Sequence, residues 1–210
     1  MFKSRALLFI GITIVAMLAG ALFAQFMRGS DQPVVNLNSG TLLPGGRDVA
    51  DFNLVDSSNA PFSRARLAGQ WSVLFFGFTN CPDICPTTLT TLAQVEKGLA
   101  DLPAAQRPRM VFVSVDPKRD TPAQVDTYIR FFSPGFVGLT GEPANVERFT
   151  RAMGVPVQIH DSGNGAYMVD HAATLFLLDP QARLTAVFSA PHQLDTLAGD
   201  LRTAITALSQ

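Results

Sequence analysis

The sequence predicts an α/β domain with a largely buried sheet, preceded by an apolar N-terminal segment. Short apolar runs rich in β-branched and aromatic residues alternate with helical stretches from Asp51 onward, which is typical of a sheet flanked by helices. Residues 6–27, in contrast, are apolar except for Thr13 and Gln25. A length of 210 residues fits one domain with an appendage of this kind.

The apolar segment is long enough to cross a bilayer, because 22 helical residues at ~1.5 Å each extend about 33 Å. Lys3 and Arg5 precede it, so the positive-inside rule keeps residues 1–5 in the cytoplasm and exports the rest. Cleavage as a secretory signal near Ala19-Gly20-Ala21 is the alternative, but the apolar run continues past these small residues. We therefore expect a single-pass anchor over residues 6–27 in the inner membrane, with the C-terminal domain on the outer, periplasmic side.

Residues 28–50 are rich in glycine, proline, serine and asparagine, so we expect a linker before a domain of residues 51–210. Within the domain, residues 71–77 and 110–115 are short and rich in β-formers, which predicts two central strands. Apolar residues repeat at helical spacing between these strands and predict a helix over 86–101. The three elements form a strand, helix and strand unit.

The remainder of the domain continues the alternation. Thr121 and Pro122 suit the cap and first position of a helix. Turn residues from Asp179 to Arg183 lie between two apolar runs and predict a hairpin. In chain order, the other expected elements are helix 121–132, strand 136–139, helix 142–153, a flexible loop 160–166, strands 173–178 and 184–188, and a final helix 193–208.

The charge balance argues against one large class of function. The chain has 16 basic and 17 acidic residues, a formal net charge of −1. No block of like charge is present that would attract nucleic acid or a lipid surface. We therefore expect no nucleic-acid partner.

Cys81 and Cys85 are the only two cysteines, and they follow the first predicted strand at the start of the predicted helix. A structural disulfide between them would close a loop of about five residues, for which the chain-entropy model gives little stabilisation. Unpaired backbone N–H groups at a helix start favour thiolates. Outside the cytoplasm, such a pair is oxidised unless a reductant or a metal intervenes. The pair therefore predicts metal binding, redox chemistry or both.

Two thiolates form an incomplete site for a soft metal, and copper(I) accepts an imidazole as a third ligand. The sequence has three histidines, His160, His171 and His192. We favour His171, which should lie at a sheet edge, over His160 in the expected loop and His192 at the start of the last helix. Zinc also accepts cysteine and histidine, but its structural sites usually have two close ligand pairs and this chain has one.

Two aspartates are candidates for supporting roles. Asp170 could orient His171, although a solvated carboxylate is an equal alternative. Asp116 ends the second predicted strand, where it could contact a partner or hold the cysteine loop. Its alternative role is to form a turn with Pro117, with Asp120 or Thr121 capping the next helix.

The motifs that carry this chemistry follow one another in a defined order. They are Gly77-Phe78-Thr79-Asn80-Cys81-Pro82-Asp83-Ile84-Cys85-Pro86, Ser114-Val115-Asp116-Pro117 with Arg119-Asp120-Thr121, Phe132-Ser133-Pro134 with Gly138-Leu139-Thr140-Gly141, and Val169-Asp170-His171. In their order and spacing, across roughly residues 51–210, they resemble the Sco/SenC family. Members of that family are membrane-anchored, thioredoxin-like copper proteins that help to assemble the dinuclear copper centre of cytochrome c oxidase.

The resemblance implies that Cys81, Cys85 and His171 bind copper, as Cu(I) or Cu(II). It implies a thioredoxin-like fold with a central mixed sheet flanked by helices. It also implies a metallochaperone whose partner is the copper-centre subunit of cytochrome c oxidase, with other copper chaperones or a thioredoxin-like reductant as further partners. Ala173-Thr174 stands where thioredoxins carry a cis-proline-threonine pair, which weakens the case for a general disulfide oxidoreductase.

Two enzymatic alternatives use the same cysteines. A thiol–disulfide reductase that keeps the partner's copper-ligand cysteines reduced would use Cys81 and Cys85 and would not need His171. A peroxiredoxin-like peroxidase fits less well, since the usual Pro-x-x-x-Thr-x-x-Cys arrangement is missing. Copper delivery and disulfide reduction can coexist in one protein, because only the reduced pair can bind copper.

Overall fold

The computed structural model of the chain describes residues 14, 16–20, 23, 36–161 and 167–209. The chain divides into two units, Met1–Val34 and Val35–Gln210. Among the described residues, no helix combines the length and the apolar character that a bilayer span requires. The predicted cytoplasmic residues 1–5 and most of the predicted anchor, residues 6–27, lie outside the described part of the chain, so the anchor stays a prediction.

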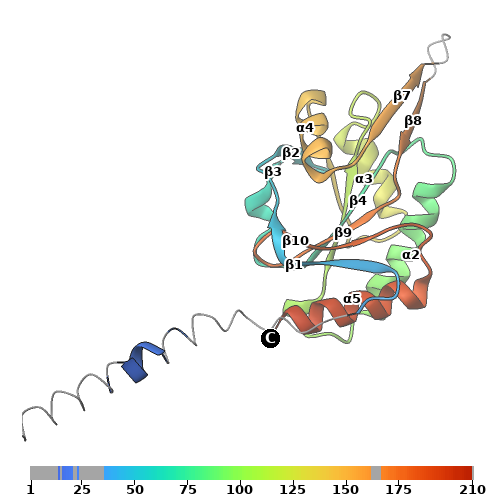
Figure 1. Ribbon diagram of the computed structural model, residues 1–210. Helices are drawn as coiled ribbons and strands as arrows, with labels where there is room; N and C mark the ends of the chain where they lie inside the picture. The colour runs from blue at the N-terminus through green and yellow to red at the C-terminus, as the bar shows by residue number, and fades with distance from the viewer. Residues whose placement is uncertain (1–13, 15, 21–22, 24–35, 162–166, 210) are drawn as a thin grey trace, which may run out of the picture. The chain divides into compact units, whose positions relative to one another are not determined.

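The second unit is built on one mixed sheet. Its strands are β1 (Gly40–Asp48), β2 (Asn53–Asp56), β3 (Pro61–Ser63), β4 (Ser72–Gly77), β5 (Arg109–Ser114), β6 (Val137–Thr140), β9 (Leu175–Leu178) and β10 (Arg183–Phe188). In the described residues they follow the order β1-β10-β9-β4-β5-β6-β2-β3 (Figure 1). β4, β5 and β6 are parallel, whereas β9 is antiparallel to both β4 and β10. The predicted α/β class with a central mixed sheet is confirmed.

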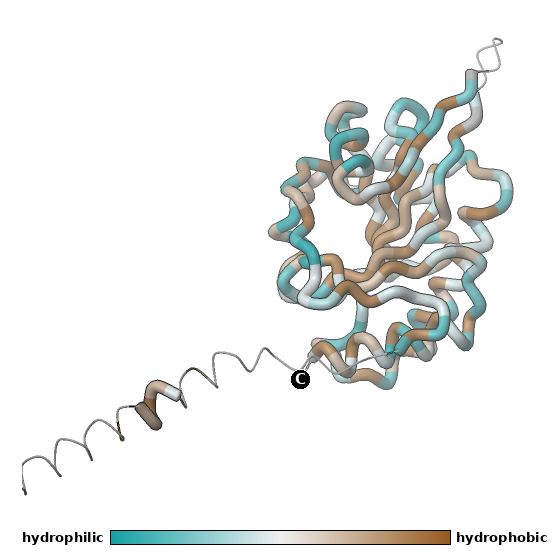
Figure 2. Tube along the Cα trace, viewed as in Figure 1, coloured by the Kyte–Doolittle hydropathy of each residue, from teal (hydrophilic) through white to brown (hydrophobic). Residues whose placement is uncertain are grey.

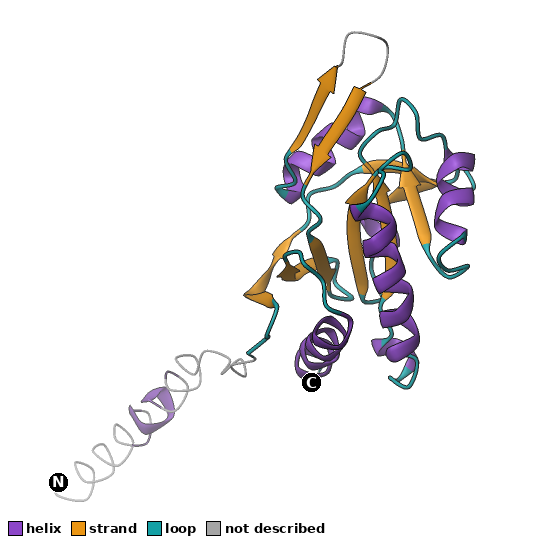
Figure 3. Ribbon diagram, turned by 90° about the vertical axis from the view of Figure 1, so that its right-hand side faces the viewer, coloured by secondary structure: helices purple, strands orange, loops and turns teal. Residues whose placement is uncertain are grey.

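Helices cover both faces of this sheet. They are α2 (Ile84–Gly98), α3 (Pro122–Arg130), α4 (Pro143–Met153) and α5 (Leu194–Leu208), with two short 3-10 turns, η1 (Arg64–Arg66) and η2 (Ala104–Gln106). On one face Cys85 of α2 lies against Gly77 of β4, and α3 packs on β6 on the same side. On the other face Phe149 of α4 packs on Phe76, with ring centroids 5.5 Å apart. α5 packs against α2 (Figure 3).

The central strands form the core. All six residues of β4 and five of the six residues of β5 are buried, because each strand has a neighbour on both sides and packed side chains on both faces. Hydrophobic residues concentrate along these strands, and hydrophilic residues lie mainly on the outer helices and loops (Figure 2). The predicted strands 71–77 and 110–115 are confirmed to within one residue.

The starts of two helices show how local sequence sets structure. Thr121 caps α3 and forms a capping box with Gln124, and Pro122 occupies the first turn, as predicted. α2 begins at Ile84, two residues before the predicted start, so Cys85 lies inside its first turn. Pro86 is tolerated there because the first-turn N–H groups have no partner within the helix.

The predicted linker of residues 28–50 is wrong at its C-terminal end. β1 pairs antiparallel with β10, from Gly40 opposite Phe188 to Asp48 opposite Arg183, with an irregularity between Leu42 and Arg47. Just before β1, the buried carboxylate of Asp200 in α5 accepts hydrogen bonds from the backbone N–H groups of Asn38 and Ser39, at 2.9 and 2.7 Å. The folded domain therefore begins before residue 51.

A two-stranded sheet stands out from the main body (Figures 1 and 3). β7 (Val157–Asp161) and β8 (Tyr167–His171) pair antiparallel with each other. The predicted flexible loop 160–166 is wrong at His160 and Asp161, because both pair with β8 as part of β7; residues 162–166 lie outside the described part of the chain. The predicted hairpin on either side of Asp179 to Arg183 is confirmed as β9 and β10.

Candidate metal centre

The cysteine loop lies at the edge of the main sheet where β4 and β5 end. These strands are parallel and in register, with Gly77 opposite Ser114, so the loops that follow them lie side by side. The first loop carries Cys81 and leads into α2 at Cys85. This is the edge at which sites in open α/β sheets usually form.

The two thiols differ in exposure and in proton affinity. Both are free, with Cys85 buried and Cys81 partly exposed, and the backbone N–H of Cys85 donates to the Cys81 sulfur at 3.3 Å. Donation from the Cys85 thiol outweighs burial and lowers the pKa of Cys81 to about 4. The same interaction, together with burial, raises the pKa of Cys85 above its ordinary value. The geometry of the pair thus favours the thiolate on Cys81 and the proton on Cys85.

His171, the last residue of β8, completes the group. Its Nε2 lies 3.3 Å from the Cys85 Sγ, and its Nδ1 lies 3.2 Å from the carbonyl oxygen of Ala172. Because that carbonyl can only accept, it favours a proton on Nδ1, which leaves the Nε2 lone pair available to a metal ion held by the sulfurs. Phe75 and Phe78 contact the ring edge-on, at centroid distances of 6.1 and 5.7 Å.

The three donor atoms fit a soft metal ion. The ligand atoms of Cys81, Cys85 and His171 lie within 4.8 Å of one another, and two sulfurs with one imidazole nitrogen suit copper(I). Gly77 provides the room: a Cβ at this position would lie 3.0 Å from the Cys85 Sγ and 2.8 Å from Phe112. The structure thus brings together the three ligand candidates that the sequence suggested.

The other two histidines lie elsewhere. Nε2 of His160 is 2.8 Å from a carboxylate oxygen of Asp170, and both side chains are mostly exposed. His192 contacts the carbonyl oxygen of Ala173 through its Nε2, at 2.6 Å. His192 therefore steadies the segment that follows His171, a role that its place before the last helix did not indicate.

The predicted roles of the two aspartates need correction. Asp170 contacts His160 and not His171, because successive residues of a strand point to opposite faces. Asp116 is buried, but it does not hold the cysteine loop: it pairs with Arg119 and accepts a hydrogen bond from the Tyr167 hydroxyl at 2.5 Å.

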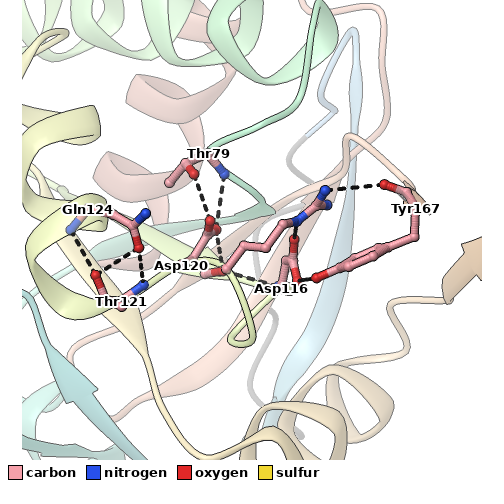
Figure 4. A network of polar contacts seen from close by, with 8 residues as sticks. Thr79, Asp116, Asp120, Thr121, Gln124 and Tyr167 are labelled. Atoms are coloured by element: carbon pink, nitrogen blue, oxygen red, sulfur yellow. Dashed lines mark hydrogen bonds and ion pairs between the residues drawn. The ribbon is translucent and has the colours of Figure 1, made fainter. Parts of the chain in front are cut away.

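Asp120 holds the cysteine loop instead (Figure 4). Its carboxylate accepts hydrogen bonds from the Thr79 N–H at 3.0 Å, the Thr79 hydroxyl at 2.6 Å and the Ser114 hydroxyl at 2.6 Å. The side chain is fully buried, and burial raises the pKa of Asp120 although these hydrogen bonds oppose the shift. Sequence reasoning gave Asp120 only a capping role. Thr79, two residues after β4, and Ser114, the last residue of the adjacent β5, were the signal for a shared acceptor.

The fold and the three donors define a class: an α/β protein with a Cys-Cys-His group at the edge of a mixed sheet. A profile of the SCO1/SenC family matches residues 43–206. The chain belongs to this family.

Individual relatives agree with this assignment. A Stutzerimonas stutzeri protein whose name describes copper binding is 41% identical over 158 residues, which cover 74% of this chain and 76% of that protein. Mitochondrial SCO1 homolog 1 of Arabidopsis thaliana is 35% identical over 152 residues, 70% of this chain and 43% of that protein, so the match spans less than half of it. The crystal structure of Arabidopsis thaliana ScoI with copper bound superimposes with a TM-score of 0.70 at 31% identity, covering 77% of this chain and 98% of that chain.

Proposed function

We propose that this protein is a membrane-anchored copper chaperone that assists assembly of the dinuclear copper centre of cytochrome c oxidase. The observation that carries the proposal is the convergence of Cys81, Cys85 and His171 donor atoms within 4.8 Å. The copper-bound Arabidopsis thaliana relative supports copper as the cargo. The resemblance of the motifs to the Sco/SenC family supports the oxidase copper-centre subunit as the recipient.

The proposed location follows from the N-terminal sequence. The apolar residues 6–27, preceded by Lys3 and Arg5, support a single-pass anchor in the inner membrane with the copper domain on the periplasmic side. In that compartment, copper would reach the site only while the cysteines are reduced. Other copper chaperones are the proposed source of the cargo, and a thioredoxin-like reductant the proposed means of keeping the pair reduced.

The graded exposure of the three donors supports transfer by ligand exchange. Cys81 and His171 are partly exposed, whereas Cys85 is buried. An incoming ligand of the recipient can therefore replace His171 or Cys81 first, while Cys85 still holds the cargo. Loading requires the proton of Cys85 to leave, because the thiolate and not the thiol binds metal.

Thiol–disulfide reduction is the second candidate, and the unequal thiols support it. The Cys81 thiolate would attack a disulfide of the oxidase subunit and form a mixed disulfide, releasing one target thiolate. Cys85 would then pass its proton to that target thiolate and attack Cys81, which releases the second target sulfur as a thiolate. The two cysteines end as a disulfide and the target as one thiol and one thiolate, so electrons and protons balance. His171 plays no part in this sequence of steps.

A copper titration distinguishes the two functions. The full chain, in detergent and reduced under anaerobic conditions, should bind one Cu(I) in competition with a chromophoric Cu(I) ligand. His171→Ala removes a proposed ligand, so it should weaken binding by at least the about 10- to 100-fold that is typical of losing an outer-shell partner and leave the two thiolates as a weaker site, whereas Cys85→Ser should lose tight binding. His160→Ala is the matched control, since it removes the same side chain outside the site and should bind as the wild type does.

Two outcomes decide between the candidates. If the wild type binds no copper tightly but reduces disulfides efficiently, the chaperone function fails and the reductase function stands. If cells carrying His171→Ala lose oxidase activity while disulfide reduction is unchanged, the reductase function alone does not account for the protein.

A further inference from the structure

One loop contacts both halves of the candidate metal centre: the cysteine loop, which carries Cys81 and Cys85, and β8, which carries His171. The loop of residues 116–120 follows β5, and Asp120 holds Thr79 of the cysteine loop through two hydrogen bonds. From the same loop, Arg119 and Asp116 reach Tyr167 at the start of β8, the strand that ends in His171 (Figure 4). The relative position of the two halves therefore depends on this loop.

The contact with β8 is made in several ways at once. Arg119 pairs with Asp116, its Nη1 donates to the Tyr167 carbonyl oxygen at 3.2 Å, and its guanidinium carbon lies 3.8 Å from the centroid of the Tyr167 ring. The Tyr167 hydroxyl donates to Asp116 at 2.5 Å. Arg119 also lies 5.8 Å from the ring centroid of Phe78, beside the cysteine loop. A charged group with this many partners, next to a buried carboxylate, has few alternative positions.

The hairpin needs such a contact. In the described residues, β7 and β8 pair only with each other and not with the main sheet, so side chains must fix the hairpin on the body. Tyr167, Val169 and His171 alternate along β8 and share one face. Val169 is buried on that face, with Tyr167 at one end of the row and His171 at the other.

We propose that Asp116, Arg119 and Tyr167 form a latch that holds the imidazole of His171 at the cysteine pair. With the latch closed, the site has two sulfur donors and one nitrogen donor. With the latch open, β8 carries the nitrogen away and two sulfur donors remain. The three are positioning residues that act through His171. Only the expected effect of the latch on copper affinity rests on the proposed copper function.

The first test needs no metal. Amide hydrogen exchange is measured on the reduced, metal-free full chain for the wild type and for Tyr167→Phe, which removes the hydroxyl and keeps the ring. Loss of a hydrogen bond to a carboxylate should accelerate exchange across β7 and β8 by about 10-fold or more, and leave β4 and β5 unchanged. Tyr128→Phe is the matched control: it changes the only other tyrosine, whose buried hydroxyl has no hydrogen-bond partner in the described residues.

The second test measures how the latch acts on the site. Tyr167→Phe and Arg119→Gln should lower Cu(I) affinity by about 10-fold, and X-ray absorption should detect fewer nitrogen ligands per copper. Combining Tyr167→Phe with His171→Ala should bind no more weakly than His171→Ala alone, because the latch has no effect once the imidazole is absent.

Three results would overturn the latch. One is unchanged hairpin exchange in Tyr167→Phe. Another is exchange that rises equally in β4, which would mean a general loss of stability. The last is a double variant weaker than His171→Ala, which would mean that the residues act on the cysteines. If the wild type fails to bind copper, the proposed function fails, but the exchange experiment still tests the latch.

Discussion

The cysteine half and the histidine half of the candidate centre are built in different ways. The cysteine half continues from β4, which is buried along its whole length and hydrogen-bonded to β5 on one side and β9 on the other. Asp120 adds a buried acceptor for the loop itself. The histidine half is carried by a hairpin that pairs only with itself among the described strands and is fixed by side chains such as Tyr167.

A rigid half and a more loosely held half suit a site that must both hold and release a metal ion. Backbone pairing and a close-packed core leave the sulfurs little freedom, since packed interiors resist displacement. A hairpin held by a few side-chain contacts opens at a lower free-energy cost than a central strand does. In the proposed function, the sulfurs would therefore retain the metal, and the imidazole would set how readily the site opens.

The reactivity of the cysteine half is the largest effect that tests the comparison. The pKa of Cys81 is lowered to about 4 by the hydrogen bond from Cys85, so Cys81 is already a thiolate at pH 6 and gains no further charge by pH 8. Its alkylation by iodoacetamide should change less than about 2-fold over this range, whereas a free thiol of pKa ≈ 8.5 should react roughly 75-fold faster at pH 8. Mass spectrometry after timed quenching gives both rates.

Variants at Cys85 provide the control for this prediction. Cys85→Ala removes the donor, so the pKa of Cys81 should rise and the pH dependence should return. Cys85→Ser keeps a hydroxyl that can donate, so its pH profile should fall between those of the wild type and Cys85→Ala. A wild-type rate that rises with pH in parallel with a free thiol would show that the thiolate is not preset in the fold.

The rigidity of the cysteine half is tested by adding one methyl group. In Gly77→Ala the new Cβ would lie 2.8 Å from Phe112 and 3.0 Å from the Cys85 sulfur, both of them buried. Overpacking of this kind should lower the free energy of unfolding by about 1–3 kcal/mol, measured by urea denaturation. Gly98→Ala is the matched control at the end of α2, where nothing lies within 4 Å, and it should be as stable as the wild type or slightly more stable. If Gly77→Ala has the same free energy of unfolding as the wild type, the cysteine half accommodates the added methyl group and is not more rigid than the hairpin.

Much of the cysteine half could be predicted from the sequence, because its signals are local. The apolar run of β4, the helical spacing of α2 and the cap at Thr121 each act within a few residues. Spacing and residue type were enough to place Cys81 and Cys85 at the end of a strand and the start of a helix. The candidate ligand His171 came from its position before a predicted strand and from the resemblance.

The missed features depend on residues far apart in the chain. β1 contains Pro44, Gly45 and Gly46 and has little strand character of its own; it is a strand because β10 lies beside it. Asp120 has the sequence context of a turn, and only folding places it beneath Thr79. The contact of Tyr167 with Asp116 joins residues 51 positions apart. No local pattern encodes such contacts.

The smallest expected effect on Cu(I) affinity comes from the outer face of the β7–β8 hairpin, and it can be compared with the effect of a substitution at the other face. Asp170 and His160 lie on the outer face with side chains 70% and 57% exposed, and contacts between exposed groups contribute roughly 0–1 kcal/mol. Asp170→Asn should therefore leave Cu(I) affinity within about 2-fold of the wild type, with unfolding little changed. Asp116→Asn makes the same chemical change in the loop that contacts Tyr167 on the other face of the hairpin, and it should weaken copper binding by about 10-fold. A 10-fold loss in Asp170→Asn would instead mean that the outer carboxylate acts on His171, and the histidine half would then depend on both faces of its hairpin.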